Sequence, residues 1–256
     1  MIFKILTDTL LESYTKKIEN LSLDKIERKD QAEFPVDYFQ FYKSVSSVYS
    51  SKIEGEDIDF DSYFKHKFLN VSFQPDYTRR ADDLYLAYDF IDNHALTFEN
   101  VQQAHTLSSR NLLSENQQGV IRSNLMFVVN KEGKIEYVAA HPATVKQELD
   151  KLFCDINLLI NSDLNLFEIF YYAAFIHLVF VKIHPFQDGN GRTARLLEKW
   201  FLIQKLGQKA VSVQLEKNYY QHLTNYYANI KKLGLEYENL DYSQSLDFLL
   251  MTATGI

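Results

Sequence analysis

Twelve consecutive residues, from His184 to Arg195, gather the side chains of this sequence that are best suited to chemistry. They read HPFQDGNGRTAR and directly follow an almost wholly apolar stretch. Two of the chain's eight glycines flank Asn190, and glycine permits positive φ angles that let successive backbone N–H groups converge. A helix that begins after such a turn adds partial positive charge at its N-terminus. The segment therefore predicts a binding site for an anion.

The charged side chains of the segment favour a polyphosphate as that anion. Arg192 and Arg195 are three residues apart and share the face of the first helical turn, and two guanidinium groups suit several phosphates better than one carboxylate. Asp188 is a hard carboxylate of the kind that holds Mg²⁺ beside phosphates. His184 has the intrinsic pKa of a general base near neutral pH. This set predicts the transfer of a phosphate-containing group to a nucleophile.

A purely structural explanation of the same residues is also available. The His-Pro pair could end one helix, Asp188 or Asn190 could cap the next, and the arginines could form a solvated face. Each residue taken singly fits that explanation better, whereas the complete set in this spacing favours a site. The segment is neither a Walker A nor a Rossmann motif, because it lacks G-x-x-x-x-G-K-[ST] and no strand precedes it.

The elements that position this segment are predicted to be helical, with one β-hairpin. The chain has only 8 glycines and 4 prolines in 256 residues, which favours long helices over many short strands. A polar amphipathic helix and a connection are expected over residues 1–30, and an irregular connection over 55–78. Two β-branched runs, Leu125–Val129 and Ile135–Ala139, predict the hairpin. Further helices are expected near 36–54, 79–94, 98–110, 142–160, 165–183, 191–206, 218–233 and 240–252.

Composition limits the remaining possibilities. A net charge of −7 disfavours nucleic acid as a partner. Cys154 is the single cysteine, which excludes an internal disulfide and fits a reducing, cytoplasmic setting; we expect it to be buried. The N-terminus lacks a signal-peptide pattern. The apolar stretch Ala173–Val181, interrupted by His177, is shorter than the roughly 20 residues of a membrane span, so it predicts a core helix with a hydrogen-bonded core histidine and no membrane contact.

The twelve residues match the signature H-P-F-x-[D/E]-G-N-G-R-x-x-R at every specified position, and on this basis the chain resembles the Fic (Fido) family. The apolar helix before the motif, the helix after it and the upstream hairpin agree with that family. The resemblance implies an all-α Fic fold with one β-hairpin flap. It further implies an N-terminal helical segment over residues 1–96, a core domain over 97–235 and a C-terminal helix over 236–256.

The resemblance implies a protein adenylyltransferase that transfers AMP from ATP to a Tyr, Thr or Ser hydroxyl of a target protein. His184 would be the catalytic base, and Asp188 would hold Mg²⁺. Arg192 would contact the β-phosphate and Arg195 the γ-phosphate. The backbone of residues 189–192 would form an anion hole, with Asn190 at the α-phosphate. The other ATP-binding residues implied are Gly189, Gly191, Thr193 and Tyr220.

A second match lies far upstream, where residues 50–55 read SSKIEG and fit the family's inhibitory motif [S/T]-x-x-x-E-[G/N]. Ser50 and Glu54 are four residues apart, so they share one face of a helix. The resemblance implies an inhibitory helix over about 36–54, on which Glu54 pairs with Arg195 and prevents the γ-phosphate from docking. A packing face of small residues with a solvated glutamate would explain the same pattern.

The expected partners are ATP and a protein substrate, which the chain itself could be, together with a possible second copy in a homodimer. By resemblance, the hairpin would hold the target segment by strand addition. Tyr226 and Tyr227 stand where relatives often place an asparagine, which leaves the choice of nucleotide open. The alternatives are removal of AMP at the same site, transfer of UMP or phosphocholine, and a silent nucleotide-sensing module. The flap residues implied are Ile135, Tyr137, Val138 and Ala139.

Overall fold

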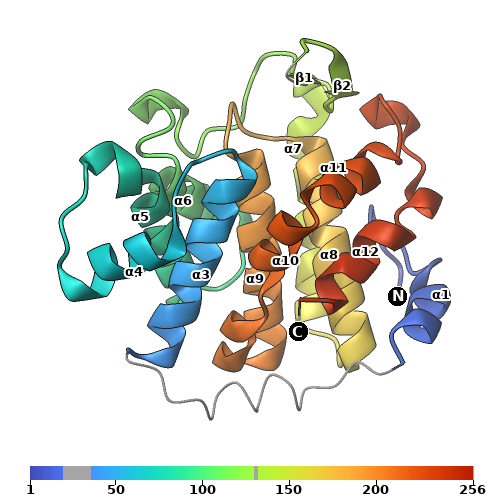
Figure 1. Cartoon of the computed structure of the whole chain (residues 1–256). Coiled ribbons are helices and arrows are strands. Elements are labelled where there is room, and N and C mark those ends of the chain that lie inside the picture. The colour runs from blue at the N-terminus through green and yellow to red at the C-terminus, as the bar shows by residue number, and fades with distance from the viewer. Residues whose placement is uncertain (20–35, 130–131, 256) are drawn as a thin grey trace.

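The structure is a computed structural model that describes residues 1–19, 36–129 and 132–255. The described chain is mostly helical and has one antiparallel hairpin (Figure 1), which confirms the predicted fold class. The later part of the segment predicted over residues 1–30 lies outside the described residues. The elements are α1 (Leu11–Lys17), α3 (Tyr38–Ile53), α4 (Phe60–Leu69), α5 (Pro75–Phe90), α6 (Phe98–Ser108), β1 (Phe127–Val129), β2 (Ile135–Val138), α7 (Pro142–Ile160), α8 (Leu166–Ile183), α9 (Asn190–Leu206), α10 (Leu215–Gln221), α11 (Leu223–Lys231) and α12 (Leu246–Ala253).

Helix α8 forms the centre of the core. It begins at a capping box in which Asn165 and Glu168 bond each other's backbone N–H groups, and its side chains are apolar on every face, as expected for a helix enclosed by others. α7, α9 and α12 pack around it. Although α8 is long and apolar enough to cross a membrane, 78% of it is buried inside the protein, in agreement with the predicted core helix.

Helix α3 is also an internal element, and its bounds match the helix predicted over 36–54. It packs against α5 and α10, and buried polar contacts fix it there. Glu216 of α10 accepts hydrogen bonds from Ser46 Oγ at 2.9 Å and from the Tyr88 hydroxyl at 2.8 Å. Small side chains allow this close approach, and the buried serines of α3 are Ser44, Ser46, Ser47, Ser50 and Ser51.

Several predicted elements differ from the structure. The connection expected over 55–78 contains helix α4, because the Asp59 side chain accepts from the Ser62 N–H and caps its N-terminus. The helix expected over 218–233 divides into α10 and α11 at His222. The helix expected over 240–252 starts later, at Leu246, after two short 3₁₀ turns.

The prediction that Cys154 is buried is wrong, because the residue is exposed. Helix α7 buries one face, on which Val145, Leu149, Leu152 and Ile156 recur every three or four residues. Cys154 falls between the last two positions, so it points away from the core. Its apolar sequence neighbours belong to a different face of the same helix.

Candidate active site

The loop between α8 and α9 is shaped by its own side chains. His184 ends α8 in the left-handed region with φ 55°, and Gly189 has φ 77° immediately before α9. Asn190 closes the loop: its Oδ1 accepts from the Phe186 N–H at 2.8 Å and its Nδ2 donates to the Phe186 carbonyl at 2.9 Å. Thr193 Oγ donates to the Gly189 carbonyl at 2.9 Å. Both side chains therefore build the loop, which leaves backbone groups to meet an anion.

His184 is held as a neutral imidazole with one nitrogen available. Its Nδ1 lies 3.2 Å from the Val181 carbonyl, and since a carbonyl only accepts, Nδ1 carries the proton. Burial lowers the pKa of His184 to about 4, which disfavours the charged form. Nε2 is consequently an unprotonated acceptor at neutral pH, the state that a general base requires.

His105 of α6 also holds this loop in place. The sequence analysis did not identify it. Its Nδ1 accepts from the Gly119 N–H at 2.8 Å and its Nε2 donates to the Asp188 carbonyl at 2.9 Å. The ring stacks on Phe186 with centroids 3.8 Å apart. Burial lowers its pKa to about 4. A buried position on an otherwise ordinary helix gives little signal in one sequence.

Arg122 is a second positioning residue that the sequence analysis did not identify. Its Nε donates to the His184 carbonyl at 2.6 Å and its Nη2 to the Ala140 carbonyl at 2.6 Å. Its backbone N–H donates to the Pro185 carbonyl at 2.9 Å. The base of the hairpin is thereby fixed to the residue that ends α8.

A carboxylate lies at the N-terminus of α9, where a phosphate was predicted to bind. Glu54 Oε1 accepts from Arg195 Nη2 at 2.6 Å and lies 2.8 Å from where a Cβ on Gly191 would be. Burial acts to raise the pKa of Glu54, but the charges of Arg195 and Arg192 hold it below the usual value. The side chain is 30% exposed, so an ionised carboxylate borders solvent at the predicted anion hole.

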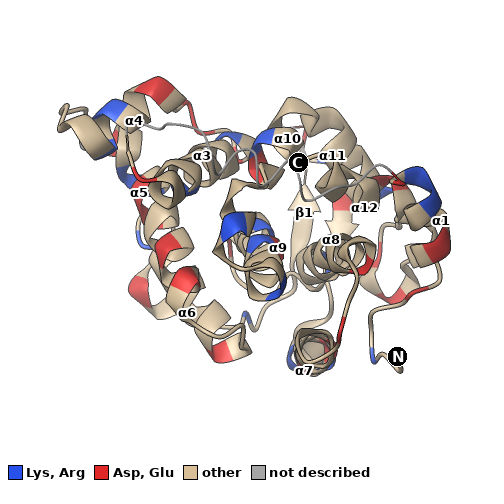
Figure 2. Ribbon diagram, turned by 90° about the horizontal axis from the view of Figure 1, so that it is seen from below, with Lys and Arg blue, Asp and Glu red and all other residues tan. Residues whose placement is uncertain are grey.

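The other arginine of the motif is paired as well. Arg192 Nη2 lies 3.3 Å from Glu56 Oε1, and Arg80 bonds the same oxygen. Arg192 Nε is buried and has no partner among the described residues. Figure 2 shows basic residues of α9 near the middle of the molecule, while the outer helices α1 and α4 carry both acidic and basic residues. The positive charge of Arg192 and Arg195 is therefore local, because the chain as a whole carries a net charge of −7.

Asp188 fits the role of a magnesium ligand. It is exposed beside the loop, and its Oδ1 accepts from the Gly189 N–H at 2.6 Å. Within the described residues there is no group of three or more His, Cys, Asp or Glu that could hold a metal. A single carboxylate is nevertheless a sufficient protein contribution when phosphate oxygens and water complete the shell of Mg²⁺.

The remaining predicted residues belong to α10 and to the hairpin. Tyr220 packs on Tyr49 of α3 with ring centroids 5.7 Å apart, and Lys52 Nζ lies 5.2 Å from its ring. In the hairpin, the buried Tyr137 donates to the Lys182 carbonyl at 2.5 Å. Val138 donates its backbone N–H to the Leu235 carbonyl at 2.8 Å, so the outer edge of β2 is already paired at that residue.

Comparison with known proteins places this geometry in a family. Residues 85–202 match the model of the Fic/DOC family. The chain is 34% identical over 90 residues to the protein adenylyltransferase Fic of Nematostella vectensis, a match covering 34% of this chain and 21% of that protein. It is 38% identical over 90 residues to the protein of the same name from Aedes aegypti, covering 34% and 18%. The matched segment thus spans about a fifth of these relatives.

Solved structures show the same fold. A Fic family protein from Desulfovibrio desulfuricans G20 superposes with a TM-score of 0.74 at 16% identity, covering all of this chain and 74% of the other. A Fic domain containing signaling protein from Bacteroides thetaiotaomicron VPI-5482 gives a TM-score of 0.64 at 19% identity, covering 95% and 90%. The complete motif, the shared fold and the family match together identify residues 85–202 of this chain as similar to the Fic/DOC family.

Proposed function

We propose that this protein is a protein adenylyltransferase that transfers AMP from ATP to a hydroxyl side chain of a target protein, and that Glu54 inhibits it. The names of the matched relatives support the reaction class. The observation that carries the proposal is the carboxylate of Glu54 between Arg195 and the N-terminus of α9. A site that accommodates this anion beside two motif arginines is suited to the phosphates of a nucleotide.

In the proposed reaction, His184 Nε2 accepts the proton of the target hydroxyl. The hydroxyl oxygen forms a bond to the α-phosphorus of ATP, the bond from that phosphorus to the bridging oxygen breaks, and pyrophosphate leaves with the electron pair. Mg²⁺ held by Asp188 would neutralise phosphate charge. A general base of this kind contributes about 10²–10⁴-fold to the rate, and the N–H groups at the start of α9 would stabilise the charge on the α-phosphate.

Inhibition follows from competition for one guanidinium. Arg195 would bind the γ-phosphate, but its Nη2 is bonded to Glu54 Oε1. Because the pKa of Glu54 is lowered by Arg195 and Arg192, the carboxylate is ionised throughout the neutral range. A nucleotide must displace it, or bind with its terminal phosphate elsewhere and its α-phosphate out of line with His184.

The hairpin supports a target that binds as an extended apolar segment. Phe127, Val129, Ile135 and the neighbouring Leu235 are each between 45% and 55% exposed. Since the outer edge of β2 is paired at Val138, strand addition would use other backbone groups of the hairpin. An extended peptide could pair there and cover these side chains.

Incubation with α-labelled ATP and Mg²⁺ tests the proposal. The wild type should label protein weakly, Glu54→Gly strongly, and the double variant Glu54→Gly/His184→Ala not at all. Asp57→Gly removes a carboxylate three residues from Glu54 and is the matched control; it should label like the wild type. Labelled UTP in parallel tests the choice of nucleotide. If Glu54→Gly bound ATP yet labelled no protein, itself included, the reaction assigned here would be wrong.

A further inference from the structure

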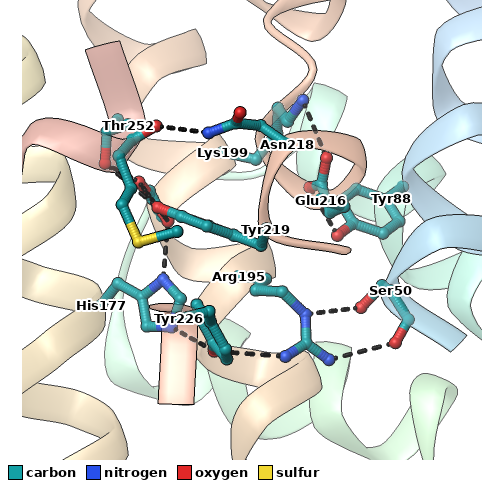
Figure 3. Close-up of polar contacts among 12 residues, drawn as sticks. Ser50, Tyr88, His177, Arg195, Lys199, Glu216, Asn218, Tyr219, Tyr226 and Thr252 are labelled. Carbon is teal, nitrogen blue, oxygen red and sulfur yellow. Dashed lines mark hydrogen bonds and ion pairs between the residues drawn. The ribbon is translucent and has the colours of Figure 1, made fainter. Parts of the chain in front are cut away.

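A buried hydrogen-bonded network connects Arg195 with His177 through Tyr226 (Figure 3). Arg195 Nη1 lies 3.4 Å from the Tyr226 hydroxyl, and that hydroxyl lies 3.0 Å from His177 Nε2. His177 Nδ1 lies 2.6 Å from Glu198 Oε2. All four side chains are at most 1% exposed. The network thus joins α9 and α11 to the central helix α8 without contact with solvent.

The far end of this network is a buried carboxylate that accepts several hydrogen bonds. Glu198 accepts from the Tyr219 hydroxyl at 2.8 Å and from Thr252 Oγ at 2.6 Å. Because Glu198 acts as the acceptor in these bonds, we assign the proton between it and His177 to Nδ1. In this neutral tautomer His177 Nε2 is an acceptor, and the Tyr226 hydroxyl donates to it. The free lone pair of Tyr226 is left for Arg195.

The contacts of Arg195 consequently divide between two parts of the protein. Three of them go to α3 and the residue that caps its C-terminus, namely Ser50 Oγ at 3.0 Å, the Ser50 carbonyl at 3.2 Å and Glu54 Oε1 at 2.6 Å. The fourth contact is with Tyr226 of α11. Ser50 at Nε and Tyr226 at Nη1 fix the plane of the guanidinium, so that Nη2 faces the position held by Glu54.

We propose that Tyr226, oriented by His177 and Glu198, is a positioning residue that holds the Arg195 guanidinium toward the terminal phosphate of the nucleotide. The inference rests on the proposed function, in which Glu54 gives up its place to that phosphate. When Glu54 leaves, Arg195 loses a charged partner, while the contact with Tyr226 remains. Tyr226 then acts only on the γ-phosphate, because Arg192 is the arginine assigned to the β-phosphate.

The test measures ATP and ADP binding by titration calorimetry with Mg²⁺ in the Glu54→Gly/His184→Ala background, which does not consume the nucleotide. Tyr226→Phe removes one oxygen and keeps the ring. It should weaken ATP binding about tenfold, the scale of one hydrogen bond to a charged group, and change ADP binding less than twofold. Tyr227→Phe is the matched control, because its hydroxyl donates to the Ile53 carbonyl at 3.1 Å; it should leave the ratio of the two affinities unchanged.

Arg195→Ala completes a double-mutant cycle. It should remove the preference for ATP, and adding Tyr226→Phe to it should have no further effect, since both act through one group. An equal loss of ATP and ADP binding in Tyr226→Phe would indicate a merely structural role and overturn the inference, as would unchanged ATP binding. If instead Arg195→Ala itself left the preference intact, or the background bound neither nucleotide, the proposed function would fail and the inference with it.

Discussion

Protonation of His105 should destabilise the protein at mildly acidic pH. Its two ring nitrogens are both used in the neutral form, one accepting from Gly119 and the other donating to Asp188. A second ring proton would have to sit on Nδ1, facing the Gly119 N–H. Burial lowers the pKa of His105 from 6.5 to about 4, and this donor-to-donor contact would further oppose the charged form.

The sign and size of the effect follow from linkage. Between pH 6.5 and 4 the unfolded chain binds a proton at this histidine and the folded protein does not, so acid favours unfolding. Above about pH 7, His105 does not lower the free energy of unfolding, because neither state binds the proton. At roughly 1.4 kcal/mol per pH unit, the loss reaches about 2 kcal/mol at pH 5 and about 3 kcal/mol below pH 4. His184 adds a loss of the same direction.

Urea unfolding at pH 7.5, 6 and 5 isolates the contribution of His105. His105→Asn should be less stable than the wild type at pH 7.5, because it loses a hydrogen bond and the stacking on Phe186. The difference should shrink by about 2 kcal/mol at pH 5, since asparagine does not titrate and His184 is common to both proteins. His94→Asn, at an exposed histidine, is the control. A difference between wild type and His105→Asn that stays constant with pH would refute the reasoning.

Two further predictions concern buried charges. Lys182 Nζ is buried without a hydrogen-bond partner among the described residues, and burial lowers its pKa to about 8; Lys182→Met should raise the free energy of unfolding by about 1–3 kcal/mol at pH 7, with the gain disappearing by about pH 10. Lys205→Met is the control; it removes three hydrogen bonds to backbone carbonyls and should lower the free energy of unfolding. A Lys182→Met protein that is less stable than the wild type at pH 7 would contradict the prediction. Glu56→Gln removes the charged partner of Arg192. In the Glu54→Gly/His184→Ala background it should tighten ATP and ADP binding alike, by up to about fivefold. Asp57→Asn, one residue away, is the control and should change neither affinity.

The chemistry of the motif could be predicted from the sequence because its residues are contiguous. His184, Asp188 and Arg195 lie on one loop and the start of the helix that follows it, so local spacing already describes much of their geometry. The long helices were predictable for a similar reason, since a 3.6-residue apolar period and caps such as Asn165 are local signals.

The supporting residues could not be predicted because they meet only in the folded chain. His105 and Asp188 are 83 residues apart, and Arg122 and His184 are 62 apart. His177 was expected to be a hydrogen-bonded core histidine, and its contacts with Glu198 and Tyr226 confirm this. What one sequence cannot supply is the identity of those partners, because contacts between distant helices leave no periodic pattern.

The burial of α3 has a consequence for how activity would be switched on. Ten of its sixteen residues are buried, so withdrawing the helix would expose core and cost far more than one ion pair. Release is therefore confined to rotation of the Glu54 side chain about its own bonds, a change that takes nanoseconds in partly exposed residues. The inhibited fraction would then be set by the populations of the Glu54 rotamers. A preference of about 3 kcal/mol for the rotamer paired with Arg195 would leave roughly one molecule in a hundred with Glu54 turned away at any instant. Under the proposed function, the protein would keep a low, continuous activity, which a bound target or ligand would change by favouring one rotamer of Glu54.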